Sequence, residues 1–135
     1  MHLLMKMITR EVLTISKTNT LRKLIQEKLK EITTLVYYRK ADEDKMYPHI
    51  VHHMDKVNKL AEHRDDVSLV VDIWTKSDKE ANEMADKVEK KLDRENLPQE
   101  SILPTFFLET RITVEDEDKS ISHIQMTFTV QNYER

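Results

Sequence analysis

The sequence predicts an α+β fold, a mainly antiparallel β-sheet with two helices packed on it, in the order α-β-β-β-α-β-β. Three observations lead to this prediction. A stretch with a hydrophobic period of two, Val67–Trp74, runs directly into a helical repeat at Asp78–Glu95. Two alternating apolar stretches in the last third of the chain are typical of a long hairpin. A further helical repeat, Thr20–Ile32, precedes every predicted strand.

The composition describes a charged chain without cysteine. Its 135 residues are enough for one domain with a core of its own. Because 39% of the residues are hydrophobic and 35% are charged, a compact core must lie under a charged surface. The net charge of -3 predicts no bulk attraction to nucleic acid or to an anionic membrane. The absence of cysteine excludes disulfides, thiolate metal sites and cysteine nucleophiles.

The chain also lacks glycine altogether. Phosphate-binding loops of the P-loop and dinucleotide types need glycine for close backbone approach, so both are excluded. The nucleophile elbow of the α/β-hydrolases is excluded for a similar reason. Turns that require a positive φ are expected to use Asn or Asp instead.

Residues 1–17 are predicted to form an N-terminal arm, followed by a single α+β domain at residues 18–135. The apolar stretch Met1–Ile8 is too short to span a membrane. It also lacks the hydrophobic region and the small-residue cleavage site of a signal peptide. We therefore expect a soluble protein that is not exported and does not associate with membranes.

The first helix is expected at about Thr20–Ile32, after the candidate N-caps Thr18, Asn19 and Thr20. A short β-branched and aromatic stretch, Leu35–Tyr38, follows it as a strand. The apolar stripe of the first helix consists of Leu21, Leu24, Ile25, Leu29 and Ile32.

A second strand is expected from Tyr47 to about Val57, with Pro48 at its first position or at a sheet edge. The polar residues 58–66 indicate an exposed loop or the end of a hairpin. Along the strand that starts at Tyr47, one face carries His49, Val51 and His53, and the other carries Ile50, His52 and Met54.

The stretch from Val67 to Leu92 gives the clearest structural signal. Its strand alternates between an apolar face and a second face that carries Asp72 and Trp74. Ser77 followed by Glu80 is a capping-box pattern at the start of the helix. We expect Asn96 to take the left-handed position after the helix, before Pro98. The buried stripe of the helix is predicted to be Ala81, Met84, Ala85, Val88 and Leu92.

In the last third, both apolar sets fall on even numbers: Phe106 to Val114 and Ile124 to Val130. Residues paired in an antiparallel ladder share a face, so the paired numbers must sum to an even value. A three-residue loop, Asp116–Asp118, satisfies this rule, and a five-residue loop has the same parity. The three-residue loop predicts the pairs Thr110–Ile124, Leu108–Met126 and Phe106–Phe128.

Six histidines suggest a metal site. His49, His52 and His53 cluster, and Asp55 and His63 follow nearby. His49 and His53 would lie about two pleats apart on one strand face, which is far for a single ion. The HExxH motif is also absent. Histidines at a surface or an interface are the alternative, and we predict no metal and no cofactor.

The acidic run Glu115–Asp118 resembles a calcium loop only in composition, since the glycine and the final glutamate are missing. A solvated hairpin tip is the better interpretation, and such a tip could still contact a basic partner surface. Asp72 is a candidate buried carboxylate, and the sequence does not rank its possible ion-pair partners, namely Arg39, Arg64 and Arg111.

Interspersed charges, as on Asp86–Lys91, indicate a solvated helix face and not a nucleic-acid surface. No serine has a convincing histidine and carboxylate partner in its sequence context. We therefore expect no enzymatic activity and name no catalytic residue.

The pattern as a whole resembles the tail-completion, or tail-terminator, proteins of long-tailed bacteriophages. The resemblance covers about residues 20–133 and consists of strand and helix patterns with a few marker residues. The missing glycines and the long leader depart from the family pattern. The stretches that carry it are Tyr37-Tyr38, Tyr47–Val51, Val71–Trp74 with the helix Ser77–Leu92, Phe107–Arg111, and Asp118-Lys119 leading into Phe128–Gln131.

This resemblance implies a structural role in the virion, at the interface of head and tail, for a protein made in the host cytoplasm. Subunits of the family form a ring, typically a hexamer, that ends the tail tube and joins it to the head connector. DNA passes through the lumen without sequence recognition. Two alternatives remain open at this point: a small adaptor or regulatory domain that binds a protein or a small ligand, and a metal-dependent enzyme.

Overall fold

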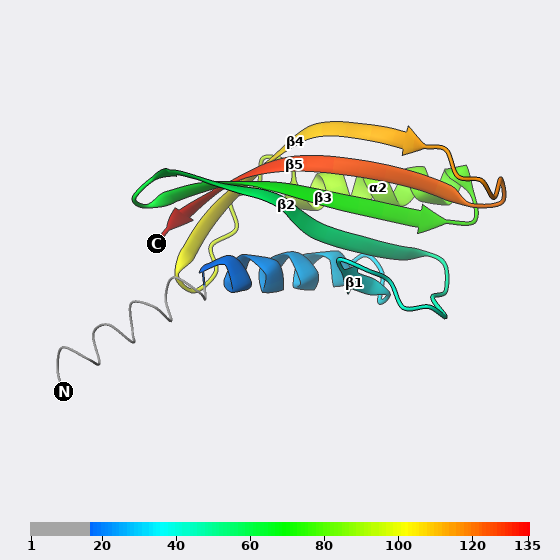
Figure 1. Ribbon diagram of the computed structural model, residues 1–135, viewed down its shortest axis with the longest axis horizontal. Coiled ribbons are helices and arrows are strands. Elements are labelled where there is room, and N and C mark those ends of the chain that lie inside the picture. The colour runs from blue at the N-terminus through cyan, green and yellow to red at the C-terminus, as the bar shows by residue number, and fades with distance from the viewer. Residues whose placement is uncertain (1–16) are drawn as a thin grey trace.

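The computed structural model describes residues 17–135 of the chain (Figure 1). Within this range it confirms the α+β fold and the predicted order α-β-β-β-α-β-β. The elements are a first helix over residues 17–30, β1 (Val36–Tyr38), β2 (His49–Ala61), β3 (Arg64–Thr75), α2 (Asp78–Leu92), β4 (Ile102–Val114) and β5 (Ser122–Glu134).

The five strands form one sheet in the order β1-β2-β3-β5-β4. Only β1 and β2 pair in parallel; the other neighbours are antiparallel. The last strand of the chain, β5, therefore lies between β3 and β4. The sheet has a very short edge strand, β1, on one side and the 13-residue strand β4 on the other.

Both helices pack on the same face of this sheet (Figure 1). α2 packs against β3, β5 and β4, whereas the first helix lies on the side of β2 and β1. An ion pair between Lys91 Nζ and Glu31 Oε2, 3.0 Å apart, links the ends of the two helices. The predicted apolar stripe of α2 is buried throughout, as are Leu21, Leu24, Ile25 and Leu29 of the first helix. We call the opposite, helix-free side of the sheet the open face.

α2 begins at the predicted cap Ser77, but only half of the predicted capping box forms, because the Ser77 amide donates to Thr75 Oγ1 at 3.3 Å. The Ser77 side chain accepts a hydrogen bond from the Glu80 amide, 3.1 Å away, which satisfies one of the free amides at the helix start. At the other end, Asp93 caps the helix, and its carboxylate accepts a hydrogen bond from the Leu108 amide on β4. The helix end is thereby fixed to the sheet.

The prediction for positive φ positions is wrong. Arg39, Arg94 and Glu100 take them, and Asn96 instead forms an isolated bridge with Thr105. A left-handed conformation costs a non-glycine residue roughly 1–2 kcal/mol. Backbone hydrogen bonds to strands offset this cost: the Arg39 amide donates to the His52 carbonyl at 2.8 Å, and the Arg94 amide to the Phe106 carbonyl at 2.7 Å.

Residues 58–66 form the end of a hairpin and not a loop. β2 continues to Ala61 and β3 starts at Arg64, so only two residues make the turn. Irregularities in the register at Asp55 and Leu60 interrupt the ladder. The hairpin projects beyond the helices at one end of the molecule (Figure 1).

The register predicted for the β4–β5 hairpin is wrong by two residues up to Leu108 and by three residues from Thr110 onward. Phe106 pairs with Val130 and Leu108 with Phe128. Because β4 ends at Val114 and β5 begins at Ser122, the loop between them is longer than three residues. Carboxylates of the acidic run stabilise this longer loop. Asp116 accepts from the Asp118 amide, and Asp118 accepts from both the amide and the hydroxyl of Ser120.

A bulge at Glu109 also reverses the faces of the outer half of β4. Beyond it, Thr110 pairs with Thr127 and Ile112 with Gln125. Ile112 therefore lies on the open face, 50% exposed, and not in the core. Arg111 turns to the helix side, where its guanidinium lies 2.7 Å from Asp86 and 3.5 Å from Glu89 of α2.

The predicted N-terminal arm at residues 1–17 lies outside the described residues except for Lys17, which is helical. The candidate caps Thr18, Asn19 and Thr20 also lie within the helix, so the prediction of its start is wrong. Lys17 Nζ lies 3.4 Å from Asp65 Oδ2, which ties the helix to β3. Neither helix within residues 17–135 has the length and apolar character needed to cross a membrane.

Candidate functional site

A row of stacked rings crosses the open face of the sheet. His49 on β2, Trp74 on β3 and His123 on β5 are direct neighbours in the ladders. The rings of Trp74 and His123 stack with centroids 3.6 Å apart at 14°, and those of Trp74 and His49 lie 6.2 Å apart at 13°. Three neighbouring strands of the sheet therefore place three flat side chains in one layer.

The next row holds the candidate carboxylate. Asp72 Oδ1 accepts hydrogen bonds from His123 Nε2 at 2.7 Å and from Gln125 Nε2 at 3.1 Å. None of the three arginines considered from the sequence is its partner. Arg64 pairs with Asp66, and Arg111 pairs with α2. Arg39 lines the same surface depression as Asp72 without an ion pair to it among residues 17–135.

This depression, of about 490 Å³, lies at the end of the open face where the ring row is located. Its floor consists of the strand residues His49, Val51, Asp72 and Trp74. Asp116 of the β4–β5 loop lies at its edge. The segment that joins β1 to β2 supplies the remaining lining residues, which are Arg39, Lys40, Ala41, Lys45 and Tyr47. We call it the open-face depression.

His49 is fixed under the rim of the depression. Its Nδ1 lies 3.0 Å from the Met46 carbonyl, and the Tyr47 ring tilts against it with centroids 5.0 Å apart. Burial lowers the pKa of His49, only partly opposed by the hydrogen bond with Met46. Lys76 Nζ lies 4.7 Å from the Tyr47 ring centroid, a cation–π contact on the same rim.

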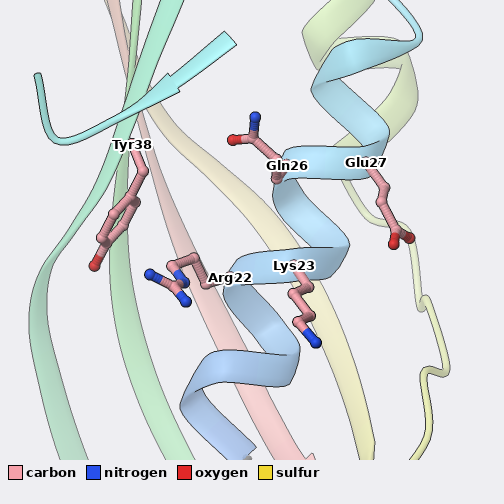
Figure 2. Close-up of a pocket in the computed structure, with 5 residues that line it drawn as sticks. All are labelled: Arg22, Lys23, Gln26, Glu27 and Tyr38. Atoms are coloured by element: carbon pink, nitrogen blue, oxygen red, sulfur yellow. The ribbon is translucent and has the colours of Figure 1, made fainter. Parts of the chain in front are cut away.

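A second depression, of about 410 Å³, lies between the first helix and β1 (Figure 2). The Arg22 guanidinium lies 5.0 Å from the Tyr38 ring centroid, whereas Lys23 and Glu27 point away from this ring (Figure 2). Gln26 donates to the Val36 carbonyl at 3.0 Å, and its amide oxygen lies 2.6 Å from His52 Nε2. Burial lowers the pKa of His52 to about 4. These contacts attach the helix to the sheet edge, so we assign this depression a structural role.

The structure separates the histidines considered for a metal site. His49 lies on the open face, His52 faces the first helix, and His63 is paired with Glu134 at the far end of the sheet. Within residues 17–135, no three His, Asp or Glu side chains come close enough together to hold a metal ion. The acidic run Glu115–Asp118 is an exposed hairpin loop, in agreement with the sequence-based interpretation.

Two residues of the site were missed from the sequence, His123 and Gln125. They stand at odd positions of β5, between the apolar residues that mark its core face. Polar side chains at those positions could have indicated a second functional face. Pairing them with Trp74 and Asp72 required the knowledge that β3 and β5 are neighbours in the sheet.

Comparisons with known proteins give a match only at the level of structure. No family model and no curated protein matches the sequence. Among solved structures, a chain of the virion of the native gene transfer agent particle is similar, with a TM-score of 0.61 and 11% sequence identity. The match covers 78% of this chain and 84% of that chain. At this identity the likeness shows that the fold is shared.

Proposed function

We propose that this protein is a structural component of a phage-like virion. The observation that carries the proposal is the shared fold with a chain of the gene transfer agent virion, over most of both chains. The independent resemblance of the sequence to phage tail-terminator proteins supports the same conclusion.

The specific role that we propose is that of a tail terminator. Copies of the chain would form a hexameric ring at the head-proximal end of the tail. The ring would bind the tail tube protein on one side and the head connector on the other, and DNA would pass through its lumen without sequence recognition. A single domain at residues 18–135 would be the building block, with no catalytic residue and no cofactor.

The surface of the domain suits a repeated heterologous contact. The open face carries partly exposed aromatic and aliphatic side chains, among them Trp74 and Ile112. One hairpin projects at each end of the sheet (Figure 1). Because the two ends differ in sequence and shape, copies that join end to end form a closed ring or an open filament.

The test is assembly of the full-length chain with tail tubes. We expect native mass spectrometry to show a closed oligomer, alone or after tubes of the cognate tail protein are added. Electron microscopy of the mixture should show rings at one end of each tube. Tubes assembled in its presence should also stop at a defined length.

Two results would contradict the role. One is a chain that stays monomeric at all concentrations and binds neither tubes nor head connectors. The other is binding along the whole tube without an effect on its growth.

A further inference from the structure

The tip of the β2–β3 hairpin carries an exposed apolar side chain between charges of both signs. Leu60 lies at an irregularity in the ladder and is 60% exposed. Lys59 precedes it, and Glu62 follows with a side chain that is 89% exposed. Val57, also on this hairpin, is 40% exposed. Two large apolar side chains are therefore exposed on one projecting hairpin, where a partner could cover them.

The open-face depression has the complementary features. Its floor contains Val51 and the ring of Trp74, which offer an aliphatic side chain an apolar surface. Asp116 stands on one wall, suited to a lysine. Three basic side chains stand on the other wall, suited to a glutamate: Arg39, Lys40 and Lys45.

The tip cannot reach the depression of its own chain. His49 on the floor and Ala61 beside the tip stand at the two ends of β2. Twelve residues of extended strand separate them by roughly 40 Å. Any contact between the two features must therefore join two copies.

We propose that the β2–β3 hairpin tip of one copy, centred on Leu60, docks in the open-face depression of a second copy. Leu60 packs against the ring floor, Lys59 approaches Asp116, and Glu62 approaches the basic wall. The contact is heterologous, so each copy keeps a free tip and a free depression for further copies. The biological setting of this contact rests on the proposed ring, but the contact can be tested separately.

Cysteine cross-linking tests the contact directly, because the wild-type chain contains no cysteine. The double variant Leu60→Cys with Ala41→Cys places one thiol on the tip and one in the depression. A disulfide requires Cα atoms within about 7 Å, so only a docked neighbour can supply the bond. We expect mild oxidation to give a covalent ladder of dimers, trimers and larger products. The control, Leu60→Cys with Lys79→Cys, places the second thiol on an exposed position of α2 instead.

At least tenfold more ladder from the first pair than from the control supports the contact. Equal ladders, or none from either pair, overturn it. Rings on tail tubes without a specific ladder would disprove this contact and leave the proposed function intact. A specific ladder from a protein that neither forms rings nor binds tubes would disprove the proposed function and leave the contact intact.

Discussion

Two buried histidines on opposite faces of the sheet are stabilised by different partners. His52 is 1% exposed on the helix side, next to the neutral amide of Gln26. His123 is 7% exposed on the open face, next to the carboxylate of Asp72. The neutral partner offers no compensation for a charge on His52.

His52 should make the protein less stable in acid. Burial lowers its pKa from the ordinary 6.5 to about 4. Above pH 6.5 the side chain is neutral in both states, so the full stability is present. As the pH falls towards 4 the unfolded chain binds a proton that the folded chain excludes, and about 3 kcal/mol is lost. We expect His52→Gln to reduce this slope in denaturant titrations between pH 7 and pH 4 and to leave the part due to His49, whose pKa burial also lowers.

The control for this experiment is His63→Gln. Hydrogen bonding with Glu134 raises the pKa of His63, so its contribution has the opposite sign: it is present in acid and is lost as the pH rises. Its removal should leave the acid slope of the wild type in place or steepen it. An unchanged slope in the His52 variant would show that another group causes the acid sensitivity.

Asp72 organises the open face through its hydrogen bonds. Asp72→Ala leaves the partly buried donors of His123 and Gln125 without an acceptor, so we expect the free energy of unfolding to fall by about 1–3 kcal/mol. Asp72→Asn keeps an acceptor oxygen and should cost less. Urea titrations monitored by Trp74 fluorescence measure both variants and also report on the ring stack. Equal losses in the two variants would show that the charge matters and the acceptor does not.

The sequence could predict a single residue of the site, but it could not predict the partner of that residue on another strand. Local pattern identified Asp72 as a candidate and placed it beside Trp74, since alternation along one strand is a local property. Its partner His123 lies 51 positions away, and only the order of strands in the sheet brings the two together. Arg94 takes a positive φ because β4 offers its amide an acceptor, a tertiary effect that outweighs local preference.

At the scale of elements, α2 was predicted well and β4 poorly. The stripe and the Ser77 cap of α2 are contained within one continuous segment, so pattern alone indicates them. The faces of β4 depend on a bulge at Glu109, and a glutamate in a strand does not indicate a bulge. One inserted residue was enough to move Ile112 from the predicted core to the open face.

The start of α2 offers a test of its local stability. Ser77→Ala removes the acceptor for the Glu80 amide, and we expect a loss of about 1 kcal/mol in the free energy of unfolding. Ser77→Asp keeps an acceptor and adds a negative charge at the positive end of the helix dipole, so it should restore the stability. Thermal and urea unfolding measure both. A loss of the same size in both variants would contradict a capping role.

The whole molecule has two unlike ends, and this determines what kinds of assembly it can form. Leu60→Glu should disable the hairpin tip, and Ala41→Trp should fill the open-face depression. Each variant alone is expected to stay monomeric, because a heterologous contact needs both features. In an equimolar mixture, the first variant still offers a depression and the second a tip. We therefore expect dimers of two 16.1 kDa chains and nothing larger in native mass spectrometry.

Lys79→Glu is the control for the mixing experiment, since it changes an exposed side chain of α2 outside the lining of the depression. It should assemble like the wild type. A two-fold contact between identical surfaces would give a different result, because no pair of defective copies could then restore an intact interface. Larger assemblies in the mixture would show that copies associate through surfaces other than the tip and the depression. Dimers alone would show that each copy has one tip and one depression, which is the arrangement that a closed ring requires.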